Sequence, residues 1–81
     1  MALSRTSDLP LHTQLRAWLL EQLQSGQYQV GDTLPTEREL EELHGVSRVT
    51  VRRALGDLAG AGYIVRQAGR GSIVLHPKVR H

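Results

Sequence analysis

The segment Thr36–Leu55, TERELEELHGVSRVTVRRAL, decides the fold of this 81-residue chain. Thr36 and Glu39 have the spacing of a capping box, in which each side chain accepts a hydrogen bond from the other residue's backbone N–H. They start a short helix, and Gly45 tolerates the left-handed conformation that ends it. Ser47 follows at once as the N-cap of another helix. The segment therefore predicts a helix-turn-helix, whose second helix can enter the major groove of DNA.

The second of these helices is expected over residues 47–62. Val46, before the cap, and Val51, at the fourth helical position, have the spacing of a hydrophobic staple that fixes the entry angle of the chain. The apolar residues recur with a helical period and predict one buried face, made of Val51, Leu55, Leu58 and Ala61. Gly62 ends the helix.

An amphipathic helix precedes this segment. Pro10 suits the first turn of a helix, and Asp8 just upstream is expected to help cap it. A single apolar stripe follows with helical spacing, formed by Leu11, Leu15, Trp18, Leu19 and Leu23. The helix ends at Ser25 and Gly26. In the loop after it, the side chains expected to pack against the core are Tyr28, Val30 and Leu34.

The hydrophobic period changes after the last helix. Residues 63–66 are β-prone, and in SIVL, residues 72–75, Ile73 and Leu75 alternate with Ser72 and Val74. Three residues between these runs suit the tip of a hairpin: Gly69, Arg70 and Gly71. The predicted fold class is therefore mainly α, with three helices and a small β-hairpin.

Composition indicates one small domain in the cytoplasm. The chain has no cysteine, no apolar run that approaches a membrane span, and no secretory signal in residues 1–8. The net charge of +2 conceals an asymmetry, because residues 1–44 hold three arginines against seven acids, whereas residues 45–81 hold six arginines and one lysine against one acid. A basic half of this kind indicates nucleic acid or an anionic membrane as the partner.

Arg48 and Arg52 stand near the start of their helix with no acid three or four residues away. Cations are unfavourable in the first turns, and two like charges at this spacing cost roughly 0.2–0.5 kcal/mol. We therefore expect both guanidinium groups to be unpaired and available to an external anion. The alternative is that both are ordinary exposed charges, which the fold tolerates because surface electrostatics are weak. Arg53 differs, since Asp57 lies four residues on and is expected to pair with it.

The chain resembles the winged helix-turn-helix domain of GntR-type bacterial transcription regulators. Four stretches carry the resemblance in the family's order and spacing: PLHTQLRAWL (10–19), SGQYQVGDTLPTEREL (25–40), GVSRVTVRRAL (45–55) and GYIVRQAGRGSIV (62–74). Together they span roughly residues 9–75, and the first and last are similar to the HutC-like subgroup. The resemblance implies sequence-specific binding of double-stranded DNA by a three-helix winged helix-turn-helix. Its recognition helix, 47–62, would enter the major groove, and its wing, 63–75, would lie at the minor groove or backbone. The resemblance further implies a core position for Ile73, which stands where phenylalanine is frequent in the family.

The resemblance also implies which residues contact DNA. The first set is Arg38, Ser47, Arg48, Thr50, Arg52, Gly69 and Arg70. The secondary candidates are Thr36, Val49, Arg53, Arg66 and Gln67. Composition alone would make Arg38 a salt-bridged surface residue, because glutamates surround it.

Residues 1–8 are expected to form a flexible arm, residues 9–75 the DNA-binding domain, and residues 76–81 a linker toward an absent C-terminal effector-binding domain. The resemblance implies a homodimer on a two-fold symmetric operator, usually acting as a repressor, with the isolated domain a monomer or weak dimer. A small-molecule effector would act only through the absent domain.

An enzyme is not expected, because the four histidines are scattered and the glycines of GRG lie in a hairpin rather than in a nucleotide-binding loop. No metal and no cofactor are predicted. The remaining alternative is a winged-helix module for protein–protein contact without specific DNA binding. The surface of such a module exposes an apolar patch more often than a basic one.

Overall fold

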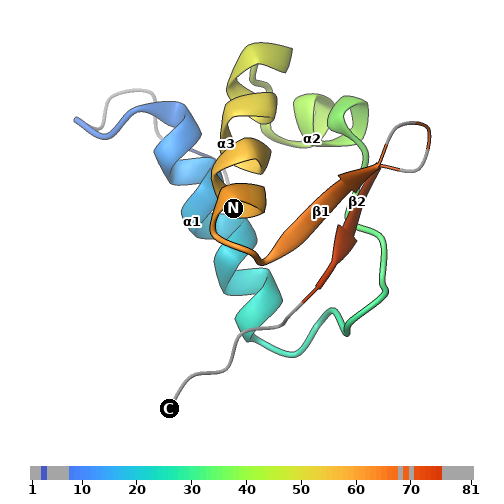
Figure 1. The fold of residues 1–81 in the computed structure, drawn as a ribbon. Coiled ribbons are helices and arrows are strands. Elements are labelled where there is room, and N and C mark those ends of the chain that lie inside the picture. The colour runs from blue at the N-terminus through green and yellow to red at the C-terminus, as the bar shows by residue number, and fades with distance from the viewer. Residues whose placement is uncertain (1–2, 4–7, 68, 70, 76–81) are drawn as a thin grey trace.

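The computed structural model describes residues 3, 8–67, 69 and 71–75. Its elements are, in chain order, α1 (Leu11–Gln24), α2 (Glu37–His44), α3 (Arg48–Gly60), β1 (Ile64–Gln67) and β2 (Gly71–Val74). The two strands form an antiparallel hairpin that projects beside α3, and α2 lies across the N-terminal half of α3 (Figure 1). The predicted fold class, a three-helix winged helix-turn-helix, is confirmed.

The turn between α2 and α3 follows the predicted capping chemistry. The Glu39 N–H donates to the Thr36 hydroxyl at 3.1 Å, and the Thr36 N–H donates to the Glu39 carboxylate at 2.8 Å. Gly45 ends α2 with φ 64°. The Ser47 hydroxyl then accepts the Thr50 N–H at 3.2 Å and caps α3. These local hydrogen bonds fix where α3 begins, and therefore which of its residues lie in the first turn.

The end of α3 is closed by a Schellman motif. The Tyr63 N–H donates to the Leu58 carbonyl at 3.0 Å, and the Gly62 N–H donates to the Ala59 carbonyl at 3.1 Å. Gly62 has φ 89°, a conformation that favours glycine. The motif turns the chain directly into β1, so the wing starts at a fixed position relative to α3.

The cap predicted for α1 is wrong. Pro10 is itself the N-cap residue, and no side chain in the described part of the chain caps this helix. Because Pro10 occupies the cap, Asp8 lies two residues too early to reach the first N–H groups. The Gln14 side-chain amide instead donates to the Leu9 carbonyl at 2.8 Å.

The loop before α2 is hydrogen-bonded to the outer edge of the wing. The Gly31 N–H donates to the Val74 carbonyl at 2.8 Å, the Val74 N–H donates to the Asp32 carbonyl at 2.8 Å, and the Leu34 N–H donates to the Ser72 carbonyl at 2.9 Å. These bonds occupy the free edge of β2. They also tie the start of α2 to the hairpin, so that α2, α3 and the wing are fixed relative to one another.

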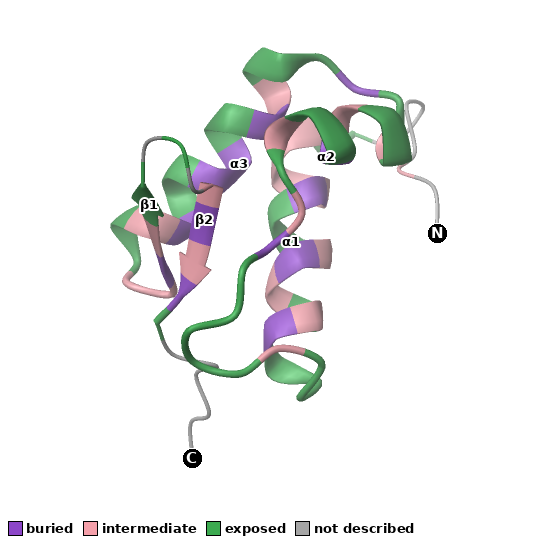
Figure 2. Cartoon of the chain, turned by 90° about the vertical axis from the view of Figure 1, so that its right-hand side faces the viewer, coloured by how far each residue is buried: buried purple, intermediate pink, exposed green. Residues whose placement is uncertain are grey.

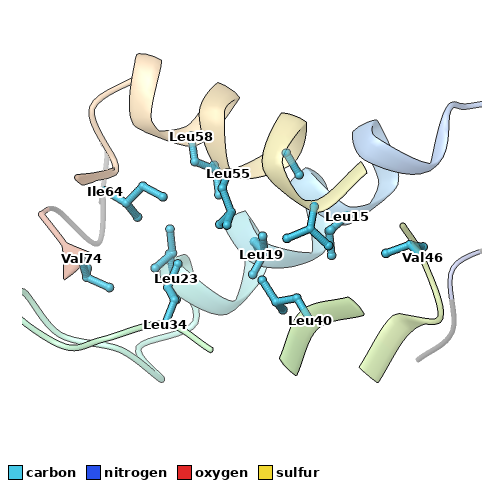
Figure 3. Packing of buried hydrophobic residues seen from close by; sticks show 12 residues of the cluster. Leu15, Leu19, Leu23, Leu34, Leu40, Val46, Leu55, Leu58, Ile64 and Val74 are labelled. Atoms are coloured by element: carbon cyan, nitrogen blue, oxygen red, sulfur yellow. The ribbon is translucent and has the colours of Figure 1, made fainter. Parts of the chain in front are cut away.

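The core lies between the three helices and the hairpin (Figures 2 and 3). Its largest fully buried side chains come from every element and from the loop: Leu15, Leu19, Leu23, Leu34, Leu40, Val51, Leu55, Leu58, Ile64 and Val74. Val46 and Val51, the predicted staple, are both buried. Two core predictions are wrong: Val30 is 63% exposed, and Ala61 is exposed as well. Val30 lies in the loop after α1 and Ala61 follows the end of α3, so neither side chain packs against the core.

The inward face of β2 is the opposite of the one predicted. Ile73 is only half-buried and Leu75 is exposed, whereas Val74 and Ser72 are buried. The hairpin register pairs Val74 with Ile64 and Ile73 with Val65. Cross-strand partners share one face of a sheet, so the burial of Ile64 turns Val74 inward and Ile73 outward.

Trp18 links α1 to the end of α2. Its ring meets the His44 ring edge-on, with centroids 4.6 Å apart and planes at 74°. Both His44 ring nitrogens are buried and have no hydrogen-bond partner among the described residues. Burial lowers the pKa of His44, so the fold favours a neutral imidazole packed as an apolar ring.

Candidate nucleic-acid interface

The first half of α3 presents its polar side to solvent. Arg48, Val49, Arg52 and Arg53 are exposed, while Val51 and Leu55 are buried. The Ser47 hydroxyl, besides capping the helix, donates to the Thr50 hydroxyl at 3.1 Å. Arg48, Val49, Arg52 and Arg53, all predicted for the recognition helix, are therefore accessible, while Thr50 is half-buried.

The prediction that Arg48 and Arg52 are unpaired is wrong. The Nε of Arg48 lies 3.3 Å from a Glu41 carboxylate oxygen, and the Nε of Arg52 lies 3.1 Å from a carboxylate oxygen of Glu37. The partners are acids of α2, across the turn, rather than acids of the same helix. The guanidinium groups are nevertheless still accessible, since the Arg48 and Arg52 side chains are 63% and 59% exposed.

Glu37 joins three elements of the surface. It accepts from Arg52 of α3 and also from the Arg66 guanidinium of β1. Burial alone would raise the pKa of Glu37, but the hydrogen bonds and charges of Arg52 and Arg66 outweigh it and lower the pKa below its ordinary value. The Glu37 carboxylate is therefore ionised at neutral pH and fixes the position of two arginines.

Two other arginines differ in their partners. Arg38 is almost fully exposed and lies 3.6 Å from the Glu42 carboxylate, as composition alone predicts. The predicted pair between Arg53 and Asp57 is wrong, because Asp57 lies 3.7 Å from Arg16 of α1 instead. Within the described residues Arg53 has no ion pair, and its charge is available at the surface.

A groove runs between the start of α2, the exposed face of α3 and the wing. The residues that line it include Thr36, Glu37, Arg52, Arg66, Gln67 and Gly69. An adjoining hollow is lined by Arg38, Glu41 and Arg48, together with Thr36, Glu37, Gly69 and Gly71. The structure thus brings most of the predicted site residues together on one side of the molecule. Gly69 has φ 80°, as expected at a hairpin tip, while Arg70 lies outside the described residues.

Sequence reasoning missed Glu37 and Glu41 as members of this surface. Glu37 and Glu41 lie four residues apart on α2, as Arg48 and Arg52 do on α3, but this matching spacing alone does not show that the two helices face each other there. Among the described residues no cluster of three or more histidine or acidic side chains is placed to hold a metal ion. In the same part of the chain, no helix is long and apolar enough to cross a membrane.

Comparison with known proteins agrees with this architecture. The family model described as "Bacterial regulatory proteins, gntR family" matches residues 11–74. The transcriptional repressor NagR of Bacillus subtilis is 39% identical over 79 residues, which cover 98% of this chain and 32% of NagR. The uncharacterized transcriptional regulator YurK of the same organism is 41% identical over 78 residues, 96% of this chain and 32% of YurK. The chain thus spans about a third of the length of these relatives.

Solved structures show the same fold. The DNA-binding domain of AraR in complex with operator ORX1 superposes with a TM-score of 0.85 at 32% identity, covering 91% of this chain and 94% of that one. YtrA from Sulfolobus acidocaldarius, a GntR-family transcription factor, gives a TM-score of 0.81 at 33% identity over 94% of this chain and 79% of that one. The chain belongs to the gntR family of bacterial regulatory proteins.

Proposed function

We propose that this chain binds double-stranded DNA sequence-specifically, as the reading head of a bacterial transcription regulator. The observation that carries the proposal is the groove with its adjoining hollow, where the exposed start of α3, the N-terminus of α2 and the wing bring Arg48, Arg52 and Arg66 to one side. Duplex DNA requires such a combination, since base edges lie in the grooves and phosphates flank them. The AraR domain of the same fold was solved with operator DNA, and NagR is named a repressor.

In this proposal α3 enters the major groove and its first turns face the bases. Arg48 and Arg52 contact base edges, with guanine the preferred base because it offers two acceptors to one guanidinium group. Val49, which is 73% exposed at the second position of the helix, suits the methyl group of thymine. Ser47 and Thr50 lie at the helix start, where hydroxyls contact phosphates or bases.

The elements beside α3 supply the contacts to the backbone and the minor groove. Those at the start of α2 are Thr36 and Arg38, and Arg53 adds a cation on α3. The wing residues are Arg66, Gln67, Gly69 and Arg70. These contacts are expected to set the position of the domain on the duplex rather than its base preference.

A longer regulator is part of the same proposal, because the chain covers only a third of NagR and YurK. A C-terminal effector-binding domain would make the protein a homodimer on a two-fold symmetric operator, with repression as the outcome. The domain alone would be a monomer or weak dimer, act in the cytoplasm, need no cofactor and catalyse no reaction.

Salt dependence of duplex binding tests the proposal. Lys and Arg side chains that neutralise phosphates release counterions, so log affinity should fall linearly with log salt, with a slope of about −0.9 per phosphate contacted. The measurement is a fluorescence anisotropy titration of a labelled duplex, selected from a random pool, at four or five salt concentrations. A flat response, or no duplex enriched from the pool, would contradict the proposal and favour a protein–protein interaction module.

A further inference from the structure

The two arginines at the start of α3 face two carboxylates at matching positions on α2. Glu37 and Glu41, called here the acidic pair, lie one helical turn apart, as Arg52 and Arg48 do. Glu41 pairs with Arg48 and Glu37 with Arg52, so the two ion pairs form successive links between the helices. Each recognition arginine thus has its own acid, across the turn that defines the motif.

The acidic pair differs from the other acids of α2 in burial. The side chains of Glu37 and Glu41 are each 25% exposed, whereas Glu42 is 71% exposed. An ion pair in a partly desolvated position is screened less than one in open solvent. The acidic pair is therefore better placed to orient a guanidinium group than an exposed surface acid.

The atoms used in these pairs decide which DNA acceptors remain favourable. Both arginines are held through Nε: Arg48 at 3.3 Å from Glu41, and Arg52 at 3.1 and 3.3 Å from the two oxygens of Glu37. Within the part of the chain that the structure describes, the hydrogen bonds of both arginines use Nε, so the two terminal amino groups of each guanidinium remain for an end-on contact. This is the edge that binds the O6 and N7 acceptors of guanine in a bidentate manner.

A phosphate and a guanine edge differ in charge at this position. Guanine O6 and N7 belong to a neutral base, so they can approach the terminal amino groups without opposing the carboxylate. A phosphate brings a negative charge toward the acidic pair, and like charges at short range repel. Contacts to random-sequence DNA rely mainly on phosphates, so the acidic pair should weaken them more than contacts to the correct bases.

We infer that Glu37 and Glu41 are specificity-determining positioning residues, which orient the recognition arginines toward base edges and disfavour their use on phosphates. This inference rests on the proposed function. Glu37 also orients Arg66 of the wing, because its carboxylate accepts a hydrogen bond from that guanidinium group as well.

The test compares Glu37→Gln and Glu41→Gln with a control of equal charge change. Glutamine keeps the size of the side chain but is not an anion. Glu21→Gln, on the exposed side of α1, serves as the control for net charge alone. Affinities of the 81-residue chain are measured for a selected duplex and a random-sequence duplex of equal length at one salt concentration. Urea unfolding of each variant checks that it is folded.

Relative to Glu21→Gln, each variant should bind the random duplex about two- to fivefold more tightly, the range that the loss of one such ion pair allows. The selected duplex should gain less, so the ratio of selected to random affinity falls. In an Arg52→Ala background the effect of Glu37→Gln on this ratio should shrink, because the carboxylate has lost its recognition arginine.

An unchanged ratio for both variants would overturn the inference, and so would an equal loss of affinity for both duplexes, which is the result expected of acids that only brace the fold. The proposed function fails separately, when the unmodified chain shows no preference for the selected duplex over the random one.

Discussion

Replacing both Arg48 and Arg52 with alanine is expected to reduce affinity for the selected duplex by about 2–6 kcal/mol. A bidentate contact between arginine and guanine contributes roughly 1–3 kcal/mol of discrimination, and the double variant removes two such contacts. The two side chains lie one turn apart, so their contributions will not be strictly additive. The affinity for a random duplex should fall by less, and anisotropy titrations of both duplexes at equal salt measure the difference.

Arg16→Ala is the matched control for the loss of a surface arginine. Arg16 lies on α1 and pairs with Asp57 at 3.7 Å, so its removal also breaks an ion pair. It is absent from the residues lining the groove, so its effect on duplex affinity should be small. A double variant of Arg48 and Arg52 that binds the selected duplex as tightly as the Arg16 variant would contradict the assignment of α3 to the major groove.

Leu55→Ala is expected to lower the free energy of unfolding by about 2–5 kcal/mol, the usual cost of a buried leucine truncated to alanine. Leu55 is 1% exposed and lies in the core cluster of Figure 3. A domain of this size has a total stability on the order of 4–12 kcal/mol, so this one change removes a large share of it. Urea unfolding followed by circular dichroism measures the shift in midpoint.

Leu43→Ala provides the comparison on α2. Leu43 is 64% exposed, and a surface substitution of this kind usually changes stability by no more than about 0.5 kcal/mol. Similar midpoints for the Leu55 and Leu43 variants would mean that the core is not packed as described.

The sequence predicted the helical part of the fold well because its signals are local. The capping box of Thr36 and Glu39, the cap at Ser47 and the glycine stop at Gly45 each depend on residues within one turn. The inward face of β2 was predicted wrongly because it depends on the pairing of Val74 with Ile64 across the hairpin. Alternation of residue types along a strand indicates that its two faces differ, but it does not indicate which face packs against the core.

The candidate site was predicted as a set of residues but not as a set of contacts. Its arginines, Arg48, Arg52 and Arg66, lie along the groove and the adjoining hollow, while their contact with DNA stays a prediction. Their partners, Glu37 and Glu41, escaped prediction because the pairs join residues 15, 29 and 7 positions apart in the chain. Such contacts depend on how α2 crosses α3 and on where the wing lies, which spacing within one helix does not reveal.

Selection of duplexes from a random pool, performed in parallel with the unmodified chain and with Arg48→Ala and followed by sequencing, tests most directly whether α3 reads bases. The unmodified chain should enrich a defined site, and the variant should enrich the same site with the preference relaxed at one base pair of each half-site, where guanine is expected. Identical preferences for the two proteins would contradict base recognition by Arg48.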